Sequence, residues 1–232
     1  MTIFSDREKE VGAKIFKKFN HGRLHKHEWP VADFDEILGI LSKKERLLID
    51  KVLGINPLDF GKNCPFYGIK PVPKNLITII GQEYEFKGEV RIVKMQYLPK
   101  NVYRSFLDLN DAMHDNIGRT INILSGYRSP AYQLVLFFYY LVRDGWDLRE
   151  VLKFSNLPGW SEHEMSKRQG MDFLPKKGIA LPKDFYKTNE YRWLVKNVAK
   201  FGFYLSYPKG NKLGMMFEPW HWHYDENKNK QR

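Results

Sequence analysis

The chain has 232 residues, of which 43% are hydrophobic and 15% aromatic, so it is long and apolar enough to fold around a core of its own. Its 38 Lys and Arg outnumber its 27 Asp and Glu, and the formal net charge of +11 favours anionic partners. Cys64 is the single cysteine, which excludes an intramolecular disulfide and a metal site built from thiolates.

Neither a secretory signal nor a membrane span is visible in the sequence. Residues 1–10 are rich in charge where a signal peptide would need an apolar segment. The most apolar stretch, Tyr132 to Val142, is too short to cross a bilayer. We therefore expect a soluble protein that is made in the cytoplasm.

The first sixty residues read as helical and polar. Ser42 and Glu45 are spaced as a capping box and Gly54 is a typical helix end, which predicts a helix over 43–53. Prolines and glycines then interrupt regular structure between 56 and 74. We predict three regions: a helical N-terminal extension with a linker (1–75), one domain (76–226) and a polar tail (227–232).

Strand and helix patterns alternate after the linker. Val93, Met95 and Tyr97 have the period of a strand with one buried face. The next segment is predicted to be a helix with one apolar face, and its inward residues are Val102, Phe106, Leu109, Met113 and Ile117.

A short apolar strand over 121–124 should lead through a turn at Gly126-Tyr127-Arg128 into a helix that begins at Ser129-Pro130 and closes at Gly145. A last helix is expected from about Thr188 to Phe201, with Gly202 as its end. Its predicted inward residues are Tyr191, Leu194, Val195 and Val198. Helices mixed with short strands indicate an α+β fold.

Histidine and acidic residues gather in the last third of the chain. His163 and Asp172 lie in one stretch, and Glu218 and His221 lie in another. Two imidazoles and a carboxylate can hold a catalytic zinc and leave a position open for water. The sequence therefore predicts a Zn²⁺ site at His163, Asp172 and His221, with Glu218 as the carboxylate that accepts a proton from water.

Three separated motifs together resemble a known family. They are Ser125-Gly126-Tyr127-Arg128-Ser129 with Gln133, the segment from Ser161-Glu162-His163 to Asp172, and Glu218-Pro219-Trp220-His221. Their types and order resemble the M15 zinc peptidases, in particular the VanY-type D-alanyl-D-alanine carboxypeptidases, over roughly residues 76–224.

The resemblance implies a fold and a set of roles. The fold would be a small antiparallel sheet flanked by helices, the M15 or Hedgehog-like peptidase domain, here with a helical N-terminal extension. Glu218 would be the general base, and Arg128 would hold a substrate carboxylate or polarise the scissile carbonyl. Further substrate contacts would come from Gln133, Ser161, Trp220 and His223.

The chain departs from the family pattern at two places. Eight residues, 164–171, separate His163 from Asp172, two more than the pattern has, and Ser166 replaces an expected glycine. His223 stands where relatives carry a basic residue. Because His221 and His223 point the same way on a strand, a His-x-His metal pair is an alternative.

Other features have structural explanations. Trp160, Trp220 and Trp222 are expected to pack around the site. Glu162 and Glu164 are predicted to be solvated. The remaining histidines, His21, His25, His27 and His114, are assigned to surface or core, although His25-x-His27 could bind metal adventitiously.

The expected function is hydrolysis of a peptide bond next to a D-amino acid in peptidoglycan stem peptides or muropeptides, by a D,D-carboxypeptidase or an endopeptidase. The basic surface would hold the anionic cell wall, which the chain would reach by non-standard export or after lysis. Two alternatives stay open: a non-catalytic, zinc-bearing wall-binding module, and a nucleic-acid-binding protein. The second is disfavoured, since no nucleic-acid reading motif supports the charge and aromatic content.

Overall fold

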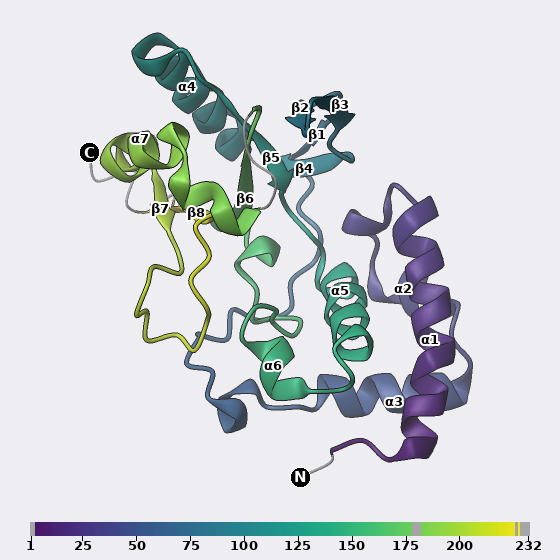
Figure 1. Cartoon of the computed structure of the whole chain (residues 1–232). Helices are drawn as coiled ribbons and strands as arrows, with labels where there is room; N and C mark the ends of the chain where they lie inside the picture. The colour runs from purple at the N-terminus through teal and green to yellow at the C-terminus, as the bar shows by residue number, and fades with distance from the viewer. Residues whose placement is uncertain (1–2, 178–181, 226, 228–232) are drawn as a thin grey trace. The chain divides into compact units, whose positions relative to one another are not determined.

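The computed structural model describes residues 3–177, 182–225 and 227, and its helices and small antiparallel sheets confirm the predicted α+β class (Figure 1). The chain divides into two compact units. Unit 1 comprises residues 1–72, 128–164 and 212–216, and unit 2 comprises 73–127, 165–211 and 217–232. The predicted domain boundaries themselves stay a prediction.

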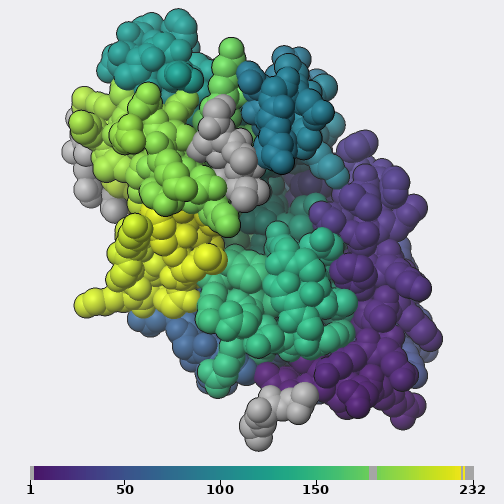
Figure 2. Space-filling view, viewed as in Figure 1, coloured from purple at the N-terminus to yellow at the C-terminus, as the bar shows by residue number. Residues whose placement is uncertain are grey.

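Unit 1 is helical and forms around α5. Its helices are α1 (Asp6–His25), α2 (Phe34–Gly39), α3 (Lys43–Leu53), α5 (Pro130–Arg143) and α6 (Leu148–Leu152), with 3-10 turns at Trp29–Val31, Pro57–Phe60 and Glu162–Glu164. Helix α5 buries residues on most of its circumference, and α1, α2 and α6 pack against it. Figure 2 shows the N-terminal helices in purple against the green surface of the α5–α6 segment.

Local sequence rules set the ends of these helices. Ser42 and Glu45 form the predicted capping box, and α3 has the predicted bounds. Ser129 caps α5 by accepting a hydrogen bond from the backbone N–H of Tyr132, with Pro130 at the first helical position. Helix α5 ends at Arg143 rather than at Gly145, and Gly145 then takes a φ of +67° in the turn.

The described residues of unit 2 form three small antiparallel sheets. Strand β1 (Leu76–Ile79) pairs with β4 (Gln96–Pro99), and β2 (Glu83–Phe86) pairs with β3 (Glu89–Ile92). The third sheet has the order β5-β6-β8-β7, from β5 (Ile121–Ser125), β6 (Arg168–Pro175), β7 (Phe203–Leu205) and β8 (His221–Asp225). The remaining elements are α4 (Lys100–Ile117), α7 (Asn189–Asn197) and 3-10 turns at Pro182–Lys187 and Val198–Phe201.

The central strands β6 and β8 have two different faces. Met171 and Phe173 of β6 and Trp222 and Tyr224 of β8 belong to the core of unit 2. Because side chains alternate along a strand, Asp172 and the two histidines of β8 share the opposite face. The core residues therefore hold the chemically active residues of both strands at one side of the sheet.

Four sequence expectations need correction in unit 2. Ile117, predicted to face inward, is 36% exposed at the end of α4. The predicted strand over 93–97 lies at Gln96–Pro99 instead, where three consecutive residues are buried because both faces are covered, so period 2 is lost. The predicted last helix is an α-helix only to Asn197 and continues as a 3-10 turn. Val195 is 57% exposed rather than inward, and Trp193 takes its place in the core.

Candidate metal centre

Asp172 and His221 are direct partners in the ladder between β6 and β8. The Asp172 Oδ1 and His221 Nδ1 atoms are 2.9 Å apart. His221 is buried and Asp172 is half-buried, so the pair is largely shielded from water. Backbone pairing continues one residue further, where the N–H of Phe173 donates to the carbonyl of Trp220. The sheet thus fixes both side chains through the backbone.

Glu218 lies in a tight turn directly before β8. The N–H of His221 donates to the Glu218 carbonyl at 3.1 Å, and the N–H of Glu218 donates to the Tyr207 carbonyl at 3.1 Å. The indole N–H of Trp222 closes the turn by donating to the Pro219 carbonyl. Glu218 is 4% exposed, so its carboxylate is a buried group of the kind that acid–base chemistry uses.

His163 lies in the 3-10 turn Glu162–Glu164, and polar contacts rather than a strand ladder hold this turn. The His163 carbonyl accepts a hydrogen bond from the N–H of Arg128 at 3.1 Å, and its N–H donates to Ser161 Oγ at 3.4 Å. The N–H of Tyr67 donates to the Gly159 carbonyl at 2.7 Å. Segments far apart in the sequence therefore determine where His163 lies.

The three residues predicted to bind metal each offer one ligand atom, and these atoms all lie within 4.8 Å of one another. Two imidazole nitrogens and a carboxylate oxygen form a donor set that suits Zn²⁺. In the described residues, no other group of three or more His, Cys, Asp or Glu side chains meets the same criterion. The chemistry and spacing of the donors fit the predicted ion, and their role as ligands stays a prediction.

Glu162 and Glu164 are buried, so the prediction that both are solvated is wrong. Glu162 Oε1 accepts a hydrogen bond from the Tyr67 hydroxyl, and Glu164 Oε2 accepts one from the Gly159 N–H at 2.7 Å. Burial raises the pKa of Glu164 to about 8, against the opposing effects of the Gly159 N–H and the Arg128 charge. Both carboxyls hold the turn together, which composition alone did not indicate.

Arg128 and Gln133 occupy the start of α5, as the motif predicts. Arg128 is half-buried, and its Nε has no hydrogen-bond partner among the residues that the structure describes. Gln133 is 2% exposed, and its Nε2 donates to the Asn156 carbonyl at 2.6 Å. Gln133 Nε2 therefore has a partner in unit 1, whereas Gln133 Oε1, like Arg128 Nε, is buried without one among the described residues. The substrate roles of both residues stay predictions.

His223 faces the same side of β8 as His221 but has different partners. Its Nδ1 lies 2.8 Å from Ser206 Oγ and 3.4 Å from an Arg168 nitrogen. Within the described part of the chain, the group of side chains spaced to hold one metal ion includes His221 and not His223. These contacts favour a supporting role for His223 over the His-x-His alternative.

Tyr207 is a site residue that no sequence motif indicated. Its ring stacks on His221 with the centroids 4.8 Å apart. Tyr207 follows β7, and the pairing of β7 with β8 brings it to His221. The predicted tryptophans differ among themselves: Trp222 is in the core, Trp160 packs on Phe66, and Trp220 is half-buried.

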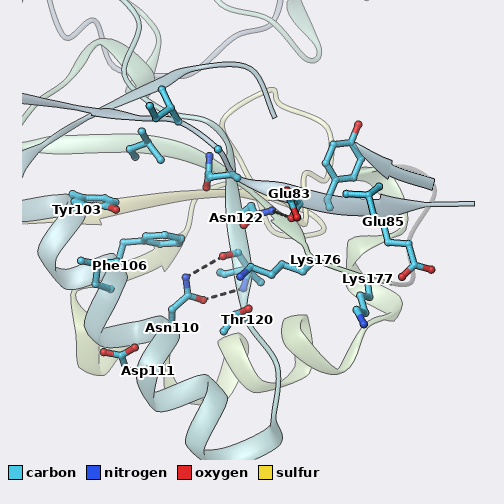
Figure 3. A pocket seen from close by; sticks show the side chains of 18 residues that line it. Glu83, Glu85, Tyr103, Phe106, Asn110, Asp111, Thr120, Asn122, Lys176 and Lys177 are labelled. Carbon is cyan, nitrogen blue, oxygen red and sulfur yellow. Dashed lines mark hydrogen bonds between the residues drawn. The ribbon is translucent and has the colours of Figure 1, made fainter. Parts of the chain in front are cut away.

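Part of the expanded loop between His163 and Asp172 borders a cavity. Ser166 and Lys167 line a cavity of about 650 Å³ in unit 2, together with the first turn of α4. A second cavity of unit 2, of about 660 Å³, lies beside β5 (Figure 3).

The amides in the wall of this second cavity serve the strand edge. The Asn110 side chain bonds both the N–H and the carbonyl of Ile121, and Gln82 does the same for Ile123. Asn122 donates to the Glu83 carbonyl. Figure 3 shows the Asn110 and Asn122 bonds as dashed lines. These amides replace a neighbouring strand at the edge, so we assign them a structural role.

In the described part of the chain, no helix combines the length and apolar character that a membrane crossing requires.

The comparisons with known proteins all find carboxypeptidases. The family model VanY, D-alanyl-D-alanine carboxypeptidase, matches residues 95–227. The chain is 28% identical over 171 residues to YodJ of Bacillus subtilis, named as a carboxypeptidase, covering 66% of this chain and 60% of YodJ. It is 32% identical over 132 residues to the D-alanyl-D-alanine carboxypeptidase of Enterococcus faecium, covering 55% of this chain and 37% of that protein.

Among solved structures, the LdcB LD-carboxypeptidase, described with the molecular basis of its peptidoglycan recognition, is similar with a TM-score of 0.54. It is 29% identical and the match covers 72% of this chain and 74% of LdcB.

Proposed function

The chain belongs to the VanY family of D-alanyl-D-alanine carboxypeptidases, and we propose on that premise that it is a zinc-dependent peptidase of peptidoglycan stem peptides. Family membership confirms the resemblance seen in the sequence, and the likeness to LdcB supports the predicted M15 fold. The observation that carries the proposed mechanism is the grouping of the His163, Asp172 and His221 ligand atoms within 4.8 Å.

Zn²⁺ held by these three residues would act as a Lewis acid that polarises a carbonyl and makes a bound water more acidic. We assign the proton transfer to Glu218, because it lies in the turn directly before His221 and its carboxylate is buried. A buried carboxylate interacts more strongly with nearby charges than a solvated one does, because water screens it less. This suits a group that accepts a proton and then returns it.

Arg128 is assigned to the substrate. A guanidinium is charged at every working pH and offers donors in a fixed plane, which suits a carboxylate at the end of a stem peptide. Its backbone N–H is bonded to the His163 carbonyl, so the side chain starts from a fixed position. Gln133, Ser161, Trp220 and His223 remain proposed substrate contacts, and Gln133 also donates to the Asn156 carbonyl.

Mass spectrometry of defined muropeptides, incubated with the zinc-loaded full chain, tests this proposal. Release of one terminal D-alanine indicates a carboxypeptidase, and cleavage of a crosslinked dimer indicates an endopeptidase. Glu218→Gln should keep its zinc and lose about 10²- to 10⁴-fold in turnover, the range of general acid–base catalysis. His163→Ala and His221→Ala should lose the zinc.

Glu190→Gln is the matched control, because Glu190 is also a buried glutamate of unit 2 but pairs with Arg119. It should keep turnover within about twofold. Equal turnover of the wild type and Glu218→Gln would refute the assigned base. Bound zinc without hydrolysis of any muropeptide would favour the non-catalytic wall-binding module instead. Action at the cell wall, by export or after lysis, is part of the same proposal.

A further inference from the structure

Histidines are concentrated in a second place that the proposed peptidase chemistry does not use. Of the seven histidines in the chain, three lie between residues 21 and 27. Short tracts of this kind are typical of metal binding when the side chains share a face. His21 and His25 belong to the last turns of α1, and His27 follows beyond the helix end at Lys26.

His21 and His25 are one helical turn apart, so their side chains leave the same face of α1. Their ring centroids are 4.6 Å apart with an interplanar angle of 40°. Both residues are exposed. Apart from this ring contact, neither imidazole has a hydrogen bond or ion pair to any residue that the structure describes. Two adjacent imidazoles are therefore accessible from solvent.

The backbone beneath the pair is held firmly in unit 1. A Cβ added at Gly22 would lie 2.0 Å from Trp29 Cη2, so the helix and this indole are in close contact. Phe19 also packs edge-on against Trp29, and the N–H of Lys26 bonds the Gly22 carbonyl at 2.8 Å. A fixed backbone lowers the entropy that two ligands lose on binding one ion.

Two of the basic side chains of α1 near the histidine pair, Arg23 and Lys18, contact other groups of unit 1. The Arg23 guanidinium lies 4.2 Å from the centroid of the Tyr139 ring and donates to Asn20. Lys18 Nζ is 2.7 Å from Glu45. Lys17, one turn before His21, is exposed and opposes a cation. The negative end of the α1 macrodipole favours a cation at this end of the helix.

We propose that His21 and His25 form a second metal site, which takes one divalent transition-metal ion such as Zn²⁺ or Cu²⁺ through one nitrogen of each imidazole. Imidazole is a suitable ligand for both ions. Because sites of this kind generally bind Cu²⁺ more tightly than Zn²⁺, we expect the higher affinity for Cu²⁺. Water completes the coordination. The site is independent of the proposed peptidase centre, since it uses none of the same residues.

Calorimetric titration of the metal-free full chain with Zn²⁺ tests the proposal. The His21→Ala and His25→Ala variants should each weaken one binding event by at least about tenfold, because loss of either imidazole removes the chelate. The double variant should bind one equivalent fewer than the wild type. The result is the difference in bound equivalents between the double variant and the wild type. An ion bound at His163 is present in both proteins and therefore cancels.

Two single variants are matched controls. His27→Ala removes the histidine beyond the helix end, and His114→Ala removes an exposed histidine of α4. Both should leave the titration unchanged, and circular dichroism should show the same helix content in all variants. The proposal is overturned if the double variant binds as many equivalents as the wild type. It is also overturned if His27→Ala, and not His21→Ala, weakens binding, since that result identifies His25-x-His27 as the pair.

Discussion

The candidate ligands are held in two different ways. Asp172 and His221 are register partners on β6 and β8, with core residues on the opposite face of both strands. His163 lies in a 3-10 turn whose contacts come from Tyr67, Arg128 and Glu164. Strand ladders and apolar burial fix the first pair cooperatively, whereas the turn depends on individual polar contacts. Substitutions should therefore affect the two regions through different mechanisms.

The largest effect should come from the core beneath the strand-held pair. Phe173 is fully buried between Phe106, Phe203 and Trp222. Phe173→Ala leaves a cavity and should lower the free energy of unfolding by about 3–5 kcal/mol, measured by urea denaturation. Val195→Ala, on the exposed face of α7, should change it by less than about 0.5 kcal/mol. A comparable loss in both variants would contradict the core described for unit 2.

A smaller, local effect is expected in the turn of His163. Gly159 has a φ of +83°, and an added Cβ would lie 2.5 Å from Phe66 Cε2. Gly159→Ala should cost about 1–3 kcal/mol and lower the hydrogen-exchange protection of the Tyr67 amide, which donates to the Gly159 carbonyl. Gly61→Ala is the control, with a φ of +88° and no atom within 4 Å of the added Cβ. Equal loss of Tyr67 protection in both variants would show that the Phe66 contact contributes nothing.

The smallest effect concerns a polar contact at the start of α1. Hydrogen bonds from Lys51 and from the Ser5 backbone hold the pKa of Glu8 at about 2. Since this pKa is below the ordinary value of 4.5, the contact stabilises the fold above that pH, and the stabilisation is lost as pH falls towards 2. Because Glu8 is partly exposed, we expect less than about 1 kcal/mol.

Urea denaturation between pH 2 and 6 measures this contribution. Glu8→Gln should be less stable than the wild type at pH 6, and the two should converge at the acid end. Glu10→Gln removes a charge from the exposed face of the same helix and should follow the wild type. A constant difference between Glu8→Gln and the wild type at every pH would mean that the ion pair with Lys51 is not its source.

The sequence by itself determined the features that depend on neighbours along the chain. Capping residues set the ends of α3 and the start of α5. The apolar period of α4 was read correctly at four positions, Val102, Phe106, Leu109 and Met113, which are all buried. The three motifs also identified the family and predicted the trio whose ligand atoms the structure brings together.

Only the tertiary structure decided which polar residues are buried and what they contact. Glu162 and Glu164 look solvated in the sequence, yet Tyr67 and Gly159 bond them in the interior of unit 1. Val195 has the spacing of an inward residue but is exposed because α7 turns Trp193 to the core. Tyr207 meets His221 through strand pairing. Burial depends on contacts between distant segments, and helical or strand periodicity carries no information about those contacts.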